Sequence, residues 1–509
     1  MSLEETADRL VWEVNRIGAI VARDRQYKGS DDELALLTTY EEICARLERR
    51  DDRATALWVR SFLLENRGLA GEAEDAILAI RNDRETARLG SRQLAFMASL
   101  TGAFPALAVR LATLRMNASA EDVFDAIEWA KGRSLEDWEG GGRWATLEDL
   151  RRALRGTHTH YITYLLDRKY TFAVLLVGDG TATSHRFDFG SDHVKAHAYQ
   201  KYIRPGGAKN GASWTSVIAG ITEPIEKAIS SNRIKPGDTL LISPHELLHL
   251  FPLHQLPVCG TPLGENLAVV RVHAAAEVIR RIKAGPPAKP QSFITIRAPR
   301  LKEFNDPDHK GAFETIHAEL GEHLPQLRPP IDGVQADAPA LFSAIRPRTV
   351  LHVMAHGDVI QKGRPLDRSY IHLAADGKLP QESIETRHGP PGALTPAALF
   401  DAVSNGTLML SGAHVTLQAC VSGHASANPQ GDAIGLEWAF LIGGAASALG
   451  THWNVDFPDA IEFSRAFYRA WLSEPKMSRA AAWLVAGATL RRRHSDFRWA
   501  AYSLTGEWR

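Results

Sequence analysis

The sequence predicts an α/β fold with a mainly parallel sheet, which follows an all-α N-terminal region. Apolar residues at helical spacing dominate as far as WEGGGRW (138–144), and beyond it short β-type runs alternate with helical stretches. Such alternation indicates a mainly parallel sheet covered by helices on both faces. The Pro-rich segment AGPPAKPQ (284–291) divides the α/β part in two. At roughly 150 residues per domain, the chain accommodates about three units. We expect their bounds to be 1–138, 145–284 and 292–509.

The first unit consists of amphipathic helices. In DDELALLTTYEEICARL (31–47), Asp31 or Asp32 can cap the helix start. The apolar residues on one face of this helix are Leu36, Leu37, Tyr40, Ile43, Cys44 and Leu47. The next stretch, 53–81, divides at Gly68 into two short helices, and helix pairs of this kind build repeat arrays. No period of about 34 residues repeats cleanly, so an irregular bundle stays open beside a TPR-like region.

The two α/β units show the alternation element by element. The first contains β-type runs at 161–166, 171–178 and 238–244 and a helical stretch at 216–229. In the second, β-type runs occupy 292–298, 349–357, 414–420 and 446–453, and WAAYSL (499–504) follows the last helix. The helical stretches of the second unit are 312–324, 395–403, 432–442, 459–472 and 478–492.

Composition and charge narrow the class of protein. The formal net charge is −1, so no basic or acidic excess indicates a nucleic acid or a membrane surface as partner. The longest strongly apolar run, 438–450, is too short to cross a bilayer, and MSLEETADRL at the N-terminus lacks the apolar segment of a signal peptide. Cys44, Cys259 and Cys420 are few and far apart, with no CxxC pair and no zinc spacing. We expect a cytoplasmic protein.

Two predicted strands end in residues that can carry chemistry. TVLHVMAHG ends at His356-Gly357, and HVTLQAC ends at Cys420. Sites in open parallel sheets form outside the carboxyl ends of the strands, so His356 and Cys420 should emerge at one edge. Histidine is a suitable base for making a thiolate, and the N–H groups of Gly357 and Cys420 can form an oxyanion hole. The competing interpretation is a buried, inert cysteine. We interpret His352, on the same strand as His356, as structural.

Several segments follow one known family in order and spacing. The chain reads LHVMAHG (351–357) and LQACVSG (417–423) where members read roughly LHFATHG and LSACETG. Further matching segments are 394–400, 431–456, 467–472 and 499–506, with 241–257 upstream. The region from about 145 to 509 thereby resembles the CHAT domain, a family of caspase-like cysteine peptidases related to separases. The chain departs from the family pattern at Val421, Asp432 and His452, and none of these changes removes His356 or Cys420.

The resemblance implies both a fold and an activity. It implies a caspase-like, mainly parallel sheet, and a cysteine endopeptidase that uses His356 and Cys420 on a protein substrate without metal or organic cofactor. Separases pair an inactive half with an active one, so 145–284 is expected to be a pseudo-peptidase half and 292–509 the active half. A helical array fused to a peptidase suggests a sensor that binds an activating protein partner at the N-terminal helices. Relatives suggest a role in bacterial antiviral defence.

Substrate preference and two rival functions stay open at this stage. A pocket for a basic side chain needs a carboxylate, and the acids in the right region are Asp456, Asp432 and Asp459. Asp432 and Asp459 can instead cap helices, so Asp456 is favoured. The rival functions are a catalytically silent CHAT scaffold that binds proteins, and a thiol hydrolase or acyltransferase of small molecules on the same two residues.

Overall fold

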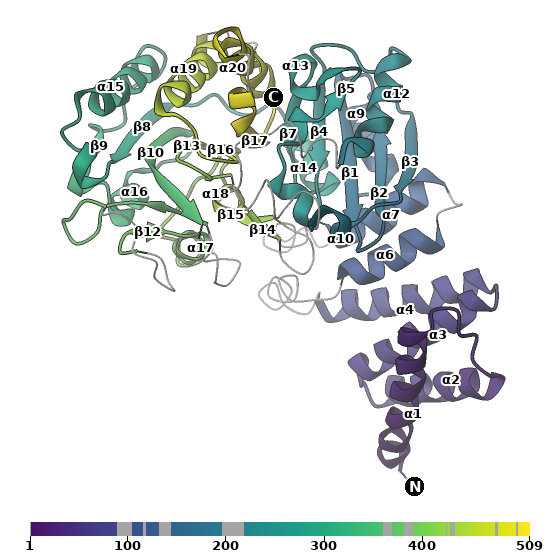
Figure 1. Cartoon of the computed structure of the whole chain (residues 1–509). Helices are drawn as coiled ribbons and strands as arrows, with labels where there is room; N and C mark the ends of the chain where they lie inside the picture. Colours follow the sequence, from purple (N-terminus) through teal and green to yellow (C-terminus); the bar gives the residue numbers. More distant parts are fainter. Residues whose placement is uncertain are drawn as a thin grey trace.

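The computed structural model describes residues 2–88, 104–115, 119–131, 144–195, 218–359, 369–380, 390–423, 425–427, 433–473, 477–494 and 497–509. An arm of helices leads into a broad α/β body with two halves side by side (Figure 1). The N-terminus lies at the far end of the arm, whereas the C-terminus lies where the two halves meet.

Helices form the arm, and their starts have local causes. The described ones are α1 (Leu3–Arg23), α2 (Asp31–Arg46), α3 (Arg50–Asn66), α4 (Ala70–Arg88), α6 (Phe104–Leu114) and α7 (Ala120–Ala130). A serine N-cap and an acid three residues later form a capping box at α1, α2 and α7. The N-cap of α2 is Ser30, so the choice of Asp31 or Asp32 from the sequence is wrong; both lie in the first turn. Gly68, with φ of +82°, separates α3 from α4 as predicted.

The first three helices of the arm share an apolar core, whereas buried residues of α4, α6 and α7 belong to the core of the first half of the body. The core of the first three helices includes Val14, Leu37, Cys44 and Leu63. Cys44 is therefore a core residue, as its place on the apolar helix face predicts. The helices pack mainly on their neighbours along the chain, which suits a helical array. A TPR-type repeat stays a prediction.

The last helix of the arm is anchored in the body. Glu128 of α7 accepts hydrogen bonds from the Tyr161 hydroxyl at 2.8 Å and from the Ala275 N–H at 2.7 Å. Just after α7, the Lys131 ammonium donates to the carbonyl oxygen of Ser243 at 2.5 Å. Glu128 and Lys131 are both buried. The α7 helix is thus part of the first half's packing, although it precedes the predicted boundary at residue 138.

The first half of the body is a mixed sheet with helices around it. Its sheet strands are β1 (Thr159–Leu166), β2 (Thr171–Leu176), β3 (Ala182–Phe187), β4 (Thr239–Ser243) and β7 (Ala268–Arg271). β1, β4 and β7 run parallel, and β2 and β3 add an antiparallel edge. The helices are α9 (Leu147–Leu154), α10 (Ser191–Val194), α12 (Glu223–Ser230), α13 (Leu263–Asn266) and α14 (Ala275–Lys283). A short hairpin joins β5 (Pro257–Val258) to β6 (Thr261–Pro262). The sequence-based prediction missed β3 and β7.

The second half carries the parallel sheet that the sequence predicts. Its strands are β8 (Ser292–Ala298), β9 (Ile331–Asp332), β10 (Thr349–Val359), β11 (Ser369–His372), β12 (Ala393–Leu394), β13 (His414–Gln418), β16 (Ser447–Thr451) and β17 (Tyr502–Gly506). β14 (Ala425–Ala427) and β15 (Ala433–Gly435) form a separate hairpin. The helices are α15 (Pro307–Gly321), α16 (Ala338–Ala344), α17 (Pro396–Ser404), α18 (Leu436–Ile442), α19 (Phe457–Ser473) and α20 (Arg479–Arg493). β9, β8, β10, β13 and β16 run parallel in that order.

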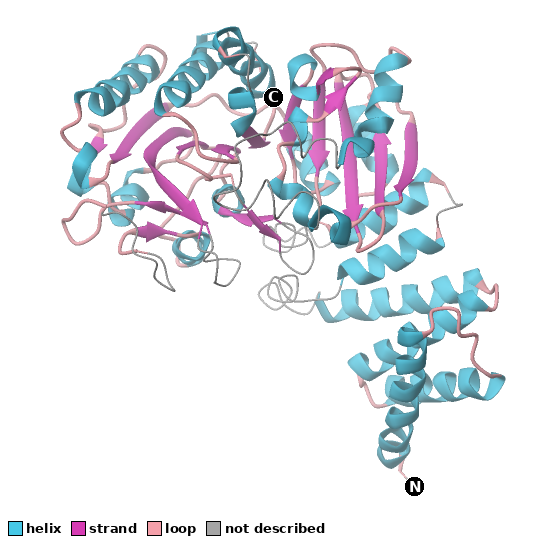
Figure 2. Ribbon diagram, in the orientation of Figure 1, coloured by secondary structure: helices cyan, strands magenta, loops and turns pink. Residues whose placement is uncertain are grey.

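The two halves share one sheet. The C-terminal strand β17 pairs antiparallel with β16 and parallel with β7, so a 13-stranded sheet runs through both halves. Figure 2 shows the strands of both halves with helices packed around them. The predicted fold class, an α/β body with a mainly parallel, helix-flanked sheet after an all-α region, is confirmed.

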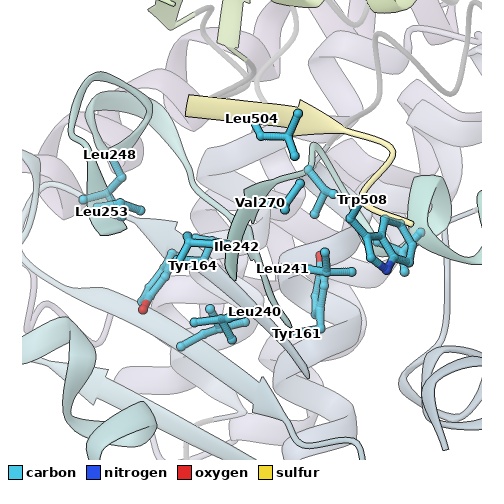
Figure 3. Close-up of a cluster of buried hydrophobic side chains, with 14 of the residues drawn as sticks. Tyr161, Tyr164, Leu240, Leu241, Ile242, Leu248, Leu253, Val270, Leu504 and Trp508 are labelled. Carbon is cyan, nitrogen blue, oxygen red and sulfur yellow. The ribbon is translucent and has the colours of Figure 1, made fainter. Parts of the chain in front are cut away.

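The core of the first half includes residues from the C-terminal end of the chain. Leu504 of β17 and Trp508 lie beside Val270 of β7 and Leu241 of β4 (Figure 3). The second half has a further core around β10, β13 and α18. Within the described part of the chain, no helix combines the length and apolar character needed to cross a membrane.

Candidate active site at the ends of β10 and β13

The carboxyl ends of β10 and β13 lie next to each other. Met354 pairs with Gln418 in the last pair of the parallel register, and His356 and Cys420 each follow two residues later along the chain. A Cβ atom at Gly357 would lie 2.1 Å from the carbonyl oxygen of Cys420. Only glycine fits this contact, which explains why glycine follows His356. The structure thus brings the backbones of Gly357 and Cys420 together, and the pairing of the His356 ring with the Cys420 thiol stays a prediction.

A carboxylate that the sequence analysis missed holds His356. The His356 Nε2 donates to Glu303 Oε2 at 2.6 Å, and the side chains are 27% and 21% exposed. Burial raises the pKa of Glu303, but the hydrogen bond and the charge of His356, together with the Arg300 N–H, outweigh burial and the pKa lies below its ordinary value. Because Nε2–H is engaged by Glu303, Nδ1 is the ring nitrogen left to act as a base. Glu303 ends the 3₁₀ turn η5 (Leu301–Glu303), which follows β8. In the sequence, the one sign of this role was that Glu303 is an acid shortly after β8, a third parallel strand.

Cys420 is a partly exposed, free thiol whose surroundings favour the protonated form. Burial raises its pKa above the ordinary value, and a hydrogen bond from the Val455 N–H to the sulfur and the charge of Arg300 act in the opposite direction. The next residue, Val421, has φ of +50°, which a β-branched residue rarely adopts. Strain of this kind is typical of functional sites. Cys420 is therefore held protonated and needs a base to react.

The loop after Cys420 is tied to β16. The Gly423 N–H donates to the Thr451 carbonyl oxygen at 2.8 Å, and the Thr451 hydroxyl donates to the Ala419 carbonyl oxygen at 2.7 Å. The Ser422 hydroxyl donates back to the carbonyl oxygen of Leu417 at 3.0 Å. These bonds fix the backbone on both sides of Cys420 and so its direction.

His352 is buried away from this edge. Its Nε2 donates to Gln418 Oε1 at 2.8 Å, and its Nδ1 contacts the Tyr468 hydroxyl at 2.9 Å. Burial lowers its pKa to about 4, so the ring is neutral near pH 7. The structural interpretation of His352 is consistent with these contacts.

Two of the predicted pocket acids share a partner. Asp456 and Asp459 each lie 3.3 Å from the Arg498 guanidinium, and Asp459 also pairs with His494 at 2.9 Å. The Asp456 side chain is 62% exposed, whereas that of Asp459 is 8% exposed. α19 begins at Phe457, so Asp459 lies inside its first turn and does not cap it. The N-cap of α18 is Gly435; the predicted pocket residue Asp432 lies outside the described residues.

Comparison with known proteins gives a family match and distant structural likenesses. Residues 218–507 match the family model of the CHAT domain. The structure is similar to Saccharomyces cerevisiae separase, solved as the separase–securin complex, at 8% identity and TM-score 0.46, over 98% of this chain and 48% of that chain. It is also similar to the Arg specific cysteine proteinase gingipain R, at 9% identity and TM-score 0.36, over 58% of this chain and 66% of that one. For the complex of Porphyromonas gingivalis RgpB pro- and mature domains, the identity is 9%, the TM-score 0.37 and the coverages 57% and 68%. The chain spans about half the length of the separase chain. A search of curated proteins found no match.

Proposed function

Because the chain belongs to the CHAT domain family, we propose that it is a cysteine endopeptidase that cleaves a protein partner through His356 and Cys420. The observation that carries this proposal is the contact between the two strand ends, where Gly357 lies against the carbonyl of Cys420. A base and a thiol that emerge from adjacent parallel strands form the minimal machinery for acyl transfer.

The reaction follows from the roles of these groups. His356 Nδ1 takes the proton of the Cys420 thiol, and the thiolate attacks the peptide carbonyl carbon. The N–H groups of Gly357 and Cys420 stabilise the oxyanion. The carbon–nitrogen bond breaks, His356 gives its proton to the leaving amine, and water then hydrolyses the thioester. Glu303 acts as a positioning residue that orients the imidazole and stabilises its cation. No step requires a metal or an organic cofactor.

The proposal also covers how the peptidase is regulated and which substrate side chain its pocket binds. The arm regulates the peptidase and binds an activating protein partner, because a half-buried, protonated Cys420 suits an enzyme that is off until triggered. The pocket for a basic side chain consists of Asp456 with Asp459 and Asp432. A substrate lysine or arginine would replace Arg498, which now pairs with Asp456 and Asp459. The setting is the cytoplasm of a bacterium, in antiviral defence.

The experiment that tests the activity compares single substitutions on one substrate mixture. Cys420→Ala and His356→Ala should each abolish the cleavage of a denatured protein that the native chain shows when activated, while the chain stays folded, and iodoacetamide should label Cys420 first. Cys259→Ala is the matched control, because Cys259 is exposed and lies in the first half. Cleavage that survives Cys420→Ala would refute the proposal. Turnover of simple thioesters without proteolysis would favour the small-molecule hydrolase, and no turnover under any trigger would favour the scaffold.

A further inference from the structure

Arg300 is a cationic residue at the sheet edge where His356 and Cys420 emerge. It follows β8, whose Ala298 pairs with Ala355 of β10, so both strands end at the same level. The Arg300 N–H donates to Glu303 Oε2 at 3.1 Å, the same oxygen that accepts the His356 hydrogen bond at 2.6 Å. The Arg300 backbone and the His356 ring are therefore held by the same carboxylate oxygen of Glu303.

The Arg300 guanidinium has no carboxylate partner among the described residues. None of the ion pairs between described side chains includes it, and its Nε is buried without a hydrogen-bond acceptor. The contrast is Arg297 on the same segment, whose Nε and Nη2 donate to the two oxygens of Asp332 at 2.7 and 2.8 Å. A guanidinium presents a planar fork of donors that fits a carboxylate, and an unused one beside a nucleophile is suited to a ligand.

The charge of Arg300 reaches the groups that surround the nucleophile. Burial raises the pKa of Cys420, and Arg300 acts against it. Burial likewise raises the pKa of Tyr370 on β11 to about 12, with Arg300 again acting in the lowering direction. Asp358 acts on the same groups with the opposite sign, and its own Oδ1 accepts the Val359 N–H at 2.7 Å. Arg300 is thus close enough to both Cys420 and Tyr370 for its charge to act on each of them.

We propose that Arg300 binds a carboxylate of the substrate, so that the peptidase takes an aspartate or glutamate side chain next to the scissile bond. This inference rests on the proposed function. It concerns a different position from the pocket at Asp456: in the sheet order β8, β10, β13, β16, Arg300 follows β8 and Asp456 follows β16, on opposite sides of the Cys420 strand. A substrate with an acidic and a basic side chain on the two sides of the cleaved bond fits both.

The test uses the full-length chain and two small reagents, and it requires no natural substrate. Iodoacetate and iodoacetamide alkylate the same thiolate, but only iodoacetate carries a carboxylate. Arg300→Gln should lower the iodoacetate rate at Cys420 by about tenfold relative to the iodoacetamide rate, as expected when a charged hydrogen-bond partner is lost. Any effect of Arg300 on the thiolate itself slows both reagents equally and cancels in the ratio. Lys302→Gln, an exposed cation in the same turn, is the matched control and should leave the ratio unchanged.

Each outcome decides the matter. An unchanged ratio in Arg300→Gln overturns the carboxylate site while Cys420 remains the nucleophile. If neither reagent labels Cys420 in the native chain, the proposed nucleophile fails and this inference fails with it. With active enzyme, a peptide library should show a preference for Asp or Glu at one position near the cut, and Arg300→Glu should turn it to Lys or Arg. Indifference of the native enzyme to acids at every position would also overturn the inference.

Discussion

Gly357 is the residue at which the site tolerates least change. A methyl group there would stand 2.1 Å from the Cys420 carbonyl oxygen, so Gly357→Ala must push the two strand ends apart. We expect cleavage to fall at least tenfold, with a loss of stability of about 1–3 kcal/mol, the usual cost of overpacking. Peptidase rates and thermal unfolding measure the two effects. Gly311→Ala in α15, where a Cβ meets nothing within 4 Å, is the control and should leave cleavage unchanged and stability the same or slightly higher, because alanine favours a helix more than glycine does.

Glu303 gives a second prediction at the scale of one side chain. Glu303→Gln keeps an acceptor for the His356 N–H but removes the negative charge that stabilises the imidazolium. We expect kcat to fall by about 10–100-fold, and Glu303→Ala to cost more because the ring then loses its anchor. A KM close to that of the native enzyme would mark a positioning role rather than lost substrate binding. Glu314→Gln, exposed on α15, serves as control, and a native kcat in Glu303→Ala would contradict this role.

At the scale of elements, buried histidines couple the parallel strands to pH. His352 of β10 and His414 of β13 are buried near α19, and burial lowers the pKa of both, to about 4 for His352. In the unfolded chain these rings take up protons near pH 6.5, so between pH 6.5 and 4 the unfolded state binds more protons. Stability is therefore full above pH 6.5 and falls as the pH drops. The difference between 6.5 and about 4 corresponds to about 3 kcal/mol for His352.

Chemical denaturation at pH 7 and pH 5 measures this effect. The unfolding midpoint should be lower at pH 5, and His352→Gln should show a smaller drop because glutamine has no proton to take up. Gln retains polar contacts with Tyr468 and Gln418, which limits the cost of the substitution itself. Equal midpoints for the native chain at the two pH values would show that the buried rings do not control its stability.

The elements also show what a single sequence reveals and why. β10 and β13 are apolar runs that are each followed by distinctive residues, so the two strands and their parallel neighbourhood were predictable from local pattern, whereas the pairing of the His356 ring with the Cys420 thiol stays a prediction. The role of Glu303 was not predictable, because this residue lies in one short turn and reaches the site through tertiary contact. The pairing of Leu504 with Val270 joins segments 234 residues apart, from 270 to 504, and no local pattern encodes such a pair. Local sequence thus predicts the elements, whereas the joint between the halves depends on three-dimensional packing.

For the whole molecule, buried polar contacts run from the arm towards the catalytic loop. Lys131, just after α7, donates to the Ser243 carbonyl, and the Ser243 hydroxyl donates to the carbonyl oxygen of His273 at 2.8 Å. His273 lines a cavity together with Glu437 and Gly423, and Gly423 belongs to the loop that follows Cys420. We propose that these contacts and the cavity couple the arm to the loop after Cys420, which only a measurement of coupling can establish.

The same contacts dictate how the regulatory role of the arm is tested. A deletion must spare α7, because Glu128 and Lys131 are buried in the first half and α7 begins with its own capping box at Ser119. We expect the full-length chain to be nearly inactive, since burial keeps Cys420 protonated. Deletion of residues 1–118 should change both the cleavage rate and the iodoacetamide rate at Cys420, and Lys131→Met in the full chain should change them in the same direction. Circular dichroism controls for folding of each variant. High and equal rates in the full-length and shortened chains would leave the arm without a role in control, because a regulator that can be removed without effect regulates nothing.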